Sequence, residues 1–159
     1  TDSPPNIQVP VLTIGDFAEG KRHLDFVRMD IEGYEVEVLG GLVSTLDRGE
    51  FNARILFETH PENYNSDGRN MRLVLKELFT RGYRVKWLVA DQYYKQRAWD
   101  TFREKGYPDS HIIEIFRKCD RVIYRSDSDA EAIELICGTD LVRAVLLEHS
   151  SDVRAEERR

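Results

Sequence analysis

The sequence predicts an α/β three-layer sandwich built around parallel strands, and three observations support this prediction. The apolar run 26–29 ends in an acidic turn that contains a glycine, and a helical pattern follows over 34–46. The same order of apolar run and helix recurs at 53–59 and 70–81, and a third apolar run follows at 83–89. Short links between alternating strands and helices predict parallel strands joined by right-handed crossovers.

The segment before the first strand has little regular pattern. Residues 1–6 contain two prolines and predict an extended lead-in, 9–13 predicts a short extended segment, and 16–20 allows one helical turn. The first long helix is predicted because apolar side chains recur at spacings of three and four, at Val36, Leu39, Val43 and Leu46. Two glycines inside it, Gly40 and Gly41, weaken it by up to ~1 kcal/mol each relative to alanine.

The second long helix has a clear apolar stripe and ends at Gly82. The stripe consists of Met71, Val74, Leu75, Leu78 and Phe79. Residues 63–69 before it are polar and predict a loop on the carboxyl side of the sheet.

After residue 90 the pattern loosens, and we expect 91–118 to be an insertion, either a lid or an oligomer contact. A helix over 92–105 carries Tyr93, Tyr94, Trp99 and Phe102, and a short apolar piece follows at 112–116. The aromatic residues indicate a packed helix face more often than a substrate platform. The chain then predicts a strand at 121–125, a helix at 131–137 that begins near 127–130, and a last apolar strand at 141–148. We expect one partial domain over 1–149 and a charged tail over 150–159.

Asp30 and Glu32 follow the first strand directly, where open α/β sheets bind their ligands. The alternative is structural: Asp30 caps the next helix and Glu32 favours its positive end, worth ~0.3–1 kcal/mol. Gly33 predicts a tight turn with positive φ. Glu35, inside the helix, is expected to be structural.

Glu58 and His60 end the second strand and are expected to face the same cleft as Asp30. Carboxylates at both strand ends suit a divalent metal, although such acids are common in a chain with 29 of them. His60 is the candidate general base because the unperturbed pKa of histidine lies near ~6.5. The other reading of His60 is a solvated loop residue.

Several pieces of the chain resemble the FkbM-type methyltransferases. Asp30-Ile31-Glu32-Gly33-Tyr34-Glu35 with Val38-Leu39-Gly40-Gly41 resembles the family signature. Val9 to Phe17 resembles the segment that precedes this strand, and Ile55 to Glu58 resembles the next strand, which ends in a glutamate. The resemblance extends from about Val9 to Leu88.

The resemblance implies a Rossmann-like methyltransferase sheet whose last strand is antiparallel, and S-adenosylmethionine as the cofactor. It implies O-methylation of a small molecule or sugar, with Asp30, Glu32 and Gly33 near the cofactor. We expect Asp30 and His60 to be the catalytic residues, Asp30 for orientation and His60 as the base. The family holds the donor on a glycine-rich turn after its first strand, and no G-x-G-x-x-G occurs in these 159 residues. We therefore interpret the chain as the C-terminal half of such a domain.

Two other functions stay open on the sequence: a non-enzymatic half-domain that dimerises, and a metal-dependent hydrolase that uses Asp30, Glu32 and Glu58. The net charge of −6 disfavours binding to nucleic acid or anionic membranes. No apolar run approaches the ~20 residues that span a bilayer, and two cysteines without a C-x-x-C motif favour a reduced, cytoplasmic chain. A half-sheet exposes an edge, so a homo-oligomer through that edge is expected.

Overall fold

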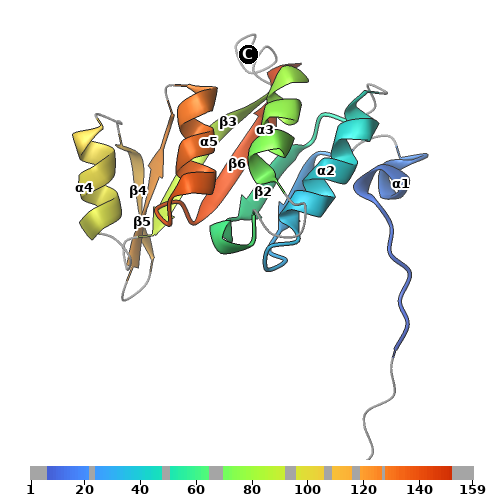
Figure 1. Cartoon of the computed structure of the whole chain (residues 1–159), viewed down its shortest axis with the longest axis horizontal. Coiled ribbons are helices and arrows are strands. Elements are labelled where there is room, and N and C mark those ends of the chain that lie inside the picture. Colours follow the sequence, from blue (N-terminus) through green and yellow to red (C-terminus); the bar gives the residue numbers. More distant parts are fainter. Residues whose placement is uncertain are drawn as a thin grey trace, which may run out of the picture.

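A mixed β-sheet forms the centre of the molecule (Figure 1). The computed structural model describes residues 7–21, 24–47, 51–64, 70–91, 96–105, 109–115, 119–126 and 128–151. The strands within them are β1 (Phe26–Met29), β2 (Arg54–Glu58), β3 (Tyr83–Asp91), β4 (Asp109–Ile115), β5 (Cys119–Tyr124) and β6 (Ala144–His149). The helices are α1 (Ile14–Ala18), α2 (Glu35–Leu46), α3 (Met71–Thr80), α4 (Gln96–Glu104) and α5 (Asp129–Gly138), with a 3-10 turn η1 (Pro61–Asn63).

The strand order in this part of the chain is β1-β2-β6-β3-β5-β4. β1 pairs with β2 in parallel, and β6 lies between β2 and β3 and is antiparallel to both. β1, β2 and β3 therefore run in one direction, and the last strand of the chain runs against them. Both features agree with the sequence prediction.

The described helices do not form the expected three layers. Figure 1 shows α2, α3 and α5 in front of the sheet, and α3 packs against both of the others. No described helix covers the opposite face, where the half-buried Leu56, Leu146 and Trp87 are neighbours in the strand register. The described residues thus form two layers, because both crossovers between parallel strands pass over the same face.

The core lies between this sheet face and the three helices. Its fully buried apolar side chains alternate along the strands and recur at helical spacing in the helices. They include Leu39, Leu42, Ile55, Phe57, Leu75, Leu78, Val145 and Leu147. Burial of such side chains supplies most of the stability of a domain of this kind.

The segment 91–118, expected as an insertion, extends the sheet in its described parts. β4 pairs with β5 in antiparallel fashion and forms one edge of the described sheet. In α4, Phe102 is buried and stacks on Tyr124 of β5, with ring centroids 4.0 Å apart. Tyr93 and Tyr94 lie outside the described residues, as does the tail after residue 151.

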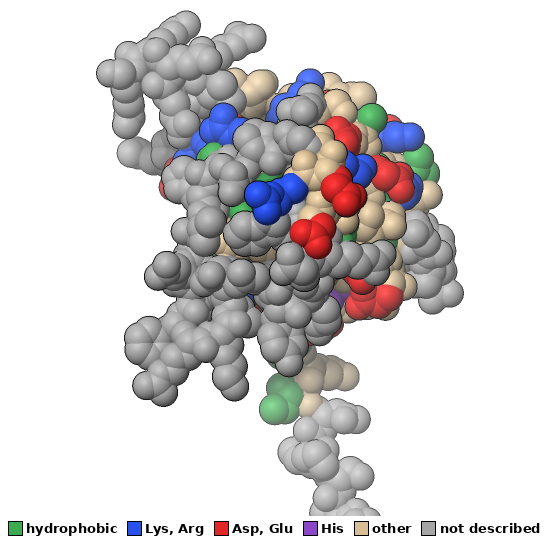
Figure 2. Space-filling view, turned by 90° about the vertical axis from the view of Figure 1, so that its left-hand side faces the viewer, with side chains coloured by type: hydrophobic (Ala, Val, Ile, Leu, Met, Phe, Trp, Pro, Cys, Tyr) green, Lys and Arg blue, Asp and Glu red, His purple; other side chains and the backbone are tan. Residues whose placement is uncertain are grey.

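Helices α2 and α3 begin and end within two residues of their predicted bounds, but the alternative in which Asp30 caps α2 is wrong. Tyr34 precedes the first residue of α2 and makes no side-chain cap, whereas Asp30 pairs with Arg28. Among the described helices, none combines the length and apolar character that crossing a bilayer requires. Figure 2 shows acidic and basic side chains together on the described part of one end of the molecule.

The two glycines Gly33 and Gly41 give opposite predictions for stability. A Cβ at Gly41 meets nothing within 4 Å, so Gly41→Ala is expected to raise the free energy of unfolding by up to ~1 kcal/mol. Gly33 has φ +98, and a Cβ there would lie 2.5 Å from Cβ of Asn63, so Gly33→Ala is expected to lower it by more than ~1 kcal/mol. Urea denaturation measures both changes. Equal effects of the two substitutions would contradict the turn and helix assigned here.

Candidate functional site

The carboxyl ends of β1 and β2 lie at one edge of the sheet. In the parallel register Met29 is the partner of Phe57, so the residues that follow these two strands emerge side by side. The first strand leads into Asp30 and Glu32, and the second leads into Thr59 and His60. This is the side of an open α/β sheet on which ligands bind.

The turn after β1 is held in an unusual backbone conformation. Glu32 has φ 55, the only described non-glycine residue with positive φ, and Gly33 follows with φ 98. A left-handed conformation costs a non-glycine residue roughly 1–2 kcal/mol. Asn63 of η1 packs against Gly33, and its side-chain amide donates to the carbonyl of Glu32 over 3.4 Å. The 3-10 turn after β2 therefore fixes the turn after β1.

A buried contact between Glu35 and His60 joins the two strand ends. Glu35 opens α2 and is 0% exposed, and His60 is 7% exposed. Oε1 of Glu35 accepts the backbone N–H of Ile31 over 3.2 Å and lies 3.2 Å from Nδ1 of His60. When the carboxylate of Glu35 is ionised it only accepts hydrogen bonds, and Nδ1 of the ring is then the donor. The other ring nitrogen, Nε2, faces Glu32.

Tyr64 holds the backbone of His60. The phenol oxygen of this fully buried tyrosine accepts a hydrogen bond from the backbone N–H of His60 over 3.0 Å, and its O–H donates to the carbonyl of Glu58 over 3.4 Å. Burial raises the pKa of Tyr64 well above its ordinary value. The phenol thus stays neutral and serves as a fixed hydrogen-bonding group.

Asp30, Glu32 and His60 form what we call the strand-end cluster. Each offers one ligand atom, and these atoms lie within 4.8 Å of one another. Nε2 of His60 is 3.4 Å from Oε2 of Glu32, whose side chain is 86% exposed. Asp30 is also exposed, and its Oδ2 is 3.3 Å from Nη2 of Arg28. The cluster thus has a buried side, formed by the ring, and an open side, formed by the carboxylates.

Glu58, the fourth candidate from the sequence, is not part of this cluster. Its Oε2 lies 2.7 Å from Nη2 of Arg143, in the segment before β6. Side chains alternate between the two faces of a strand, so Glu58 and the buried Phe57 occupy opposite faces of β2. The structure therefore brings three of the four predicted titratable side chains together and pairs the fourth with an arginine.

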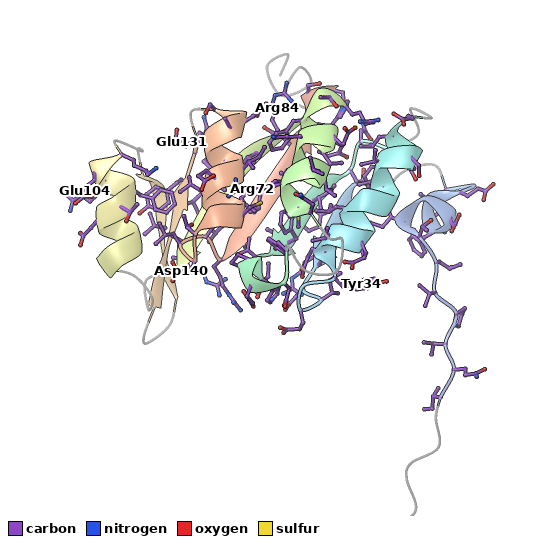
Figure 3. The ribbon with its side chains drawn as sticks, viewed as in Figure 1. Tyr34, Arg72, Arg84, Glu104, Glu131 and Asp140 are labelled. Carbon is purple, nitrogen blue, oxygen red and sulfur yellow. The ribbon has the colours of Figure 1, made fainter. Side chains whose placement is uncertain are left out.

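A small pocket adjoins His60 at the same edge of the sheet. It has a volume of about 210 Å³ and lies between the end of β2 and the segment before β6. Its lining comprises Thr59, His60, Pro61, Glu62, Asp140, Leu141, Val142 and Arg143. Figure 3 shows Tyr34 and Asp140 near this edge. A hollow of about 600 Å³ beside α1 is larger but contains no residue of the strand-end cluster.

A comparison with known protein families shows to which family the chain belongs. The sequence profile of the Methyltransferase FkbM domain matches residues 3–85, which is more than half of the 159 residues. The chain belongs to the FkbM methyltransferase family. No curated protein and no solved structure gives a match to it.

The part that matches the FkbM family contains the whole strand-end cluster. Residues 3–85 include β1, α2, β2 and α3, and with them Asp30, Glu32, Glu35 and His60. The match ends inside β3, so β4, β5, α5 and β6 lie beyond it. Beyond the residues that match the family, the sheet of this FkbM chain thus continues with strands that pair in antiparallel fashion.

Sequence reasoning missed the roles of Glu35 and Tyr64. Glu35 was expected to be structural, yet it contacts the ring of the candidate base. One signal was present: Glu35, Leu39 and Leu42 share a helix face through spacings of four and three, and all three are buried. Tyr64 had no comparable signal, because its hydrogen bonds depend on how η1 folds back onto β2.

Loss of the Tyr64 hydroxyl is expected to destabilise the protein. Tyr64→Phe leaves the backbone N–H of His60 without the phenol acceptor, which costs about 1–3 kcal/mol of unfolding free energy. Tyr34→Phe, at an exposed ring, is the matched control and is expected to lower the unfolding free energy by less than Tyr64→Phe does. Urea denaturation of both variants provides the comparison. Equal stability of Tyr64→Phe and the parent would show that this hydrogen bond does not support His60.

Proposed function

We propose that this chain forms the carboxyl-terminal part of an S-adenosylmethionine-dependent methyltransferase domain that methylates a hydroxyl oxygen of a small molecule or sugar. The observation that carries the proposal is the strand-end cluster, which lies at the carboxyl ends of two parallel strands inside the segment that matches the FkbM family. The antiparallel last strand supports the reading of this sheet as part of a Rossmann-like domain.

The residues present fit one side of a donor site. S-adenosylmethionine carries a positive sulfonium, and the exposed carboxylates of Asp30 and Glu32 supply negative charge at this edge. Gly33 allows the backbone turn that places these two carboxylates at the edge of the sheet. The glycine-rich turn of a donor site is not in this sequence, so the adenosine side of the site has no counterpart in these residues.

Bound S-adenosylmethionine supplies an activated methyl group, and the chain's own residues align the acceptor and take its proton. Asp30 accepts a hydrogen bond from the acceptor hydroxyl and orients it. Nε2 of His60 receives the proton, since Nδ1 is committed to Glu35. The carboxylate of Glu35 then stabilises the positive charge that forms on the ring.

The edge strand β1 favours pairing with a further strand. β1 ends the described sheet, and the ring of Phe26 on it is 49% exposed. Unpaired backbone groups on such an edge are a template for another strand, and a second copy of the chain is the partner we propose. This pairing is also what the dimerising half-domain requires. The metal-dependent hydrolase that uses Asp30, Glu32 and Glu58 is not favoured, because Glu58 lies outside the strand-end cluster and is engaged with Arg143.

Calorimetric titration with S-adenosylmethionine tests the proposed function. For the full product of the gene we expect micromolar binding, weakened about tenfold, or ~1.4 kcal/mol, by Asp30→Asn because a negative charge near the sulfonium is lost. Glu104→Gln removes the same charge from the exposed end of α4 and is the matched control (Figure 3). Absence of binding by the full product would contradict the proposal and favour a non-enzymatic half-domain.

A further inference from the structure

We infer that Asp30, Glu32 and His60 bind a divalent cation and that Glu35 fixes the imidazole ligand from behind. The three side chains come from two strand ends that are separated in the sequence, and their ligand atoms lie within 4.8 Å of one another. One imidazole nitrogen and two carboxylate oxygens form a donor set that first-row divalent cations accept.

The environment of His60 is the one that a metal-binding histidine requires. A ligating histidine almost always donates its second ring N–H to a carboxylate, a carbonyl or water, which fixes the ring and its tautomer. Nδ1 of His60 lies 3.2 Å from Oε1 of the fully buried Glu35. Nε2 is thereby left to face Glu32 and Asp30.

The burial of Glu35 separates this site from a chance group of surface acids. Its Oε2 is buried and has no hydrogen-bond partner among the described residues, while its Oε1 serves His60 and the N–H of Ile31. A buried carboxylate with an unsatisfied oxygen is unfavourable unless positive charge lies nearby. A cation bound to Nε2 of His60 places that charge on the other side of the ring.

The open side of the cluster also favours a cation. The carboxylates of Asp30 and Glu32 repel each other, and among the described residues Arg28 reaches only Oδ2 of Asp30. Glu32 is held in the left-handed region, where its side chain reaches Nε2 of His60. Both carboxylates are accessible to solvent, so a hydrated cation can enter.

The donor set suits Mn²⁺, because it combines hard carboxylate oxygens with one imidazole and leaves positions for water. The catalytic role of the cation, described next, rests on the proposed function, whereas cation binding itself does not. The acceptor oxygen replaces one bound water, and the cation promotes loss of the hydroxyl proton to solvent. That oxygen then bonds to the methyl carbon while the carbon–sulfur bond breaks and its electron pair stays on sulfur. With the cation bound, His60 is a ligand, so it no longer takes the proton.

Electron paramagnetic resonance with Mn²⁺ alone tests the site in the 159-residue chain. We expect one bound Mn²⁺ per chain, with electron spin echo modulation from a directly coordinated nitrogen. Asp30→Asn is expected to weaken binding at least tenfold, His60→Gln to remove the nitrogen modulation, and Glu35→Gln to weaken binding by about 10–100-fold. Glu58→Gln, which removes a charge on the same strand outside the cluster, is the control and should bind like the parent.

Two results would overturn the inference. The first is that no Mn²⁺ binds at millimolar concentration. The second is that Asp30→Asn and His60→Gln leave Mn²⁺ binding unchanged, which would show an adventitious ion only. Because His60 is buried, circular dichroism checks the fold of His60→Gln, and the exposed Asp30→Asn carries the test if that variant does not fold. The measurement involves neither donor nor acceptor. Mn²⁺ binding without S-adenosylmethionine binding by the full gene product would reject the proposed function and retain the cation site.

Discussion

The contact between Glu35 and His60 is the constraint on which the candidate site depends. It joins the first residue of α2 to the residues after β2, and both side chains are almost entirely removed from water. Buried ionisable groups are tolerated only when they are paired and hydrogen-bonded, and removal of one member of such a pair costs roughly 3–5 kcal/mol. The pair therefore fixes the distance between the two strand ends and the orientation of the imidazole.

The parallel register of β1 and β2 supplies the rest of the geometry. Met29 opposite Phe57 sets both strand ends at one edge, and Asn63 packed on Gly33 links the two loops that follow. Phe57 is fully buried beneath the helices, so a slip of one residue would exchange it with Leu56 and break the core. Core packing and site geometry thus depend on the same register.

The sequence predicts the elements of this fold well but predicts their layering less well. Helices and strands up to residue 89 follow from apolar periodicity, which is a local property that a single sequence contains. The position of β6 between β2 and β3, and of β5 and β4 beyond β3, depends on pairing between distant segments. The layering of the described helices on one sheet face has the same cause: periodicity shows that a helix is amphipathic but not which face of the sheet it covers.

The candidate site, like the fold, could be predicted from the sequence only in part. Asp30, Glu32 and His60 could be predicted, because each directly follows an apolar run and strand ends of a parallel sheet meet at one edge. The contribution of Glu35 could not be predicted, since it depends on burial of this side chain and on a partner, His60, that is 25 residues away in the sequence. Glu58 occupies the same strand as His60, but its pairing with Arg143 is set by β6, which no local pattern connects to β2.

The most direct test of this account is nuclear magnetic resonance of the His60 ring nitrogens in ¹⁵N-labelled protein. The account predicts a proton on Nδ1, in either charge state of the ring, that exchanges slowly with water because it is bound to the buried Glu35. A ring whose Nδ1 carries no proton, or whose two tautomers average as they do in free histidine, would contradict the claim that Glu35 fixes His60 and presents Nε2 to the open side of the cluster.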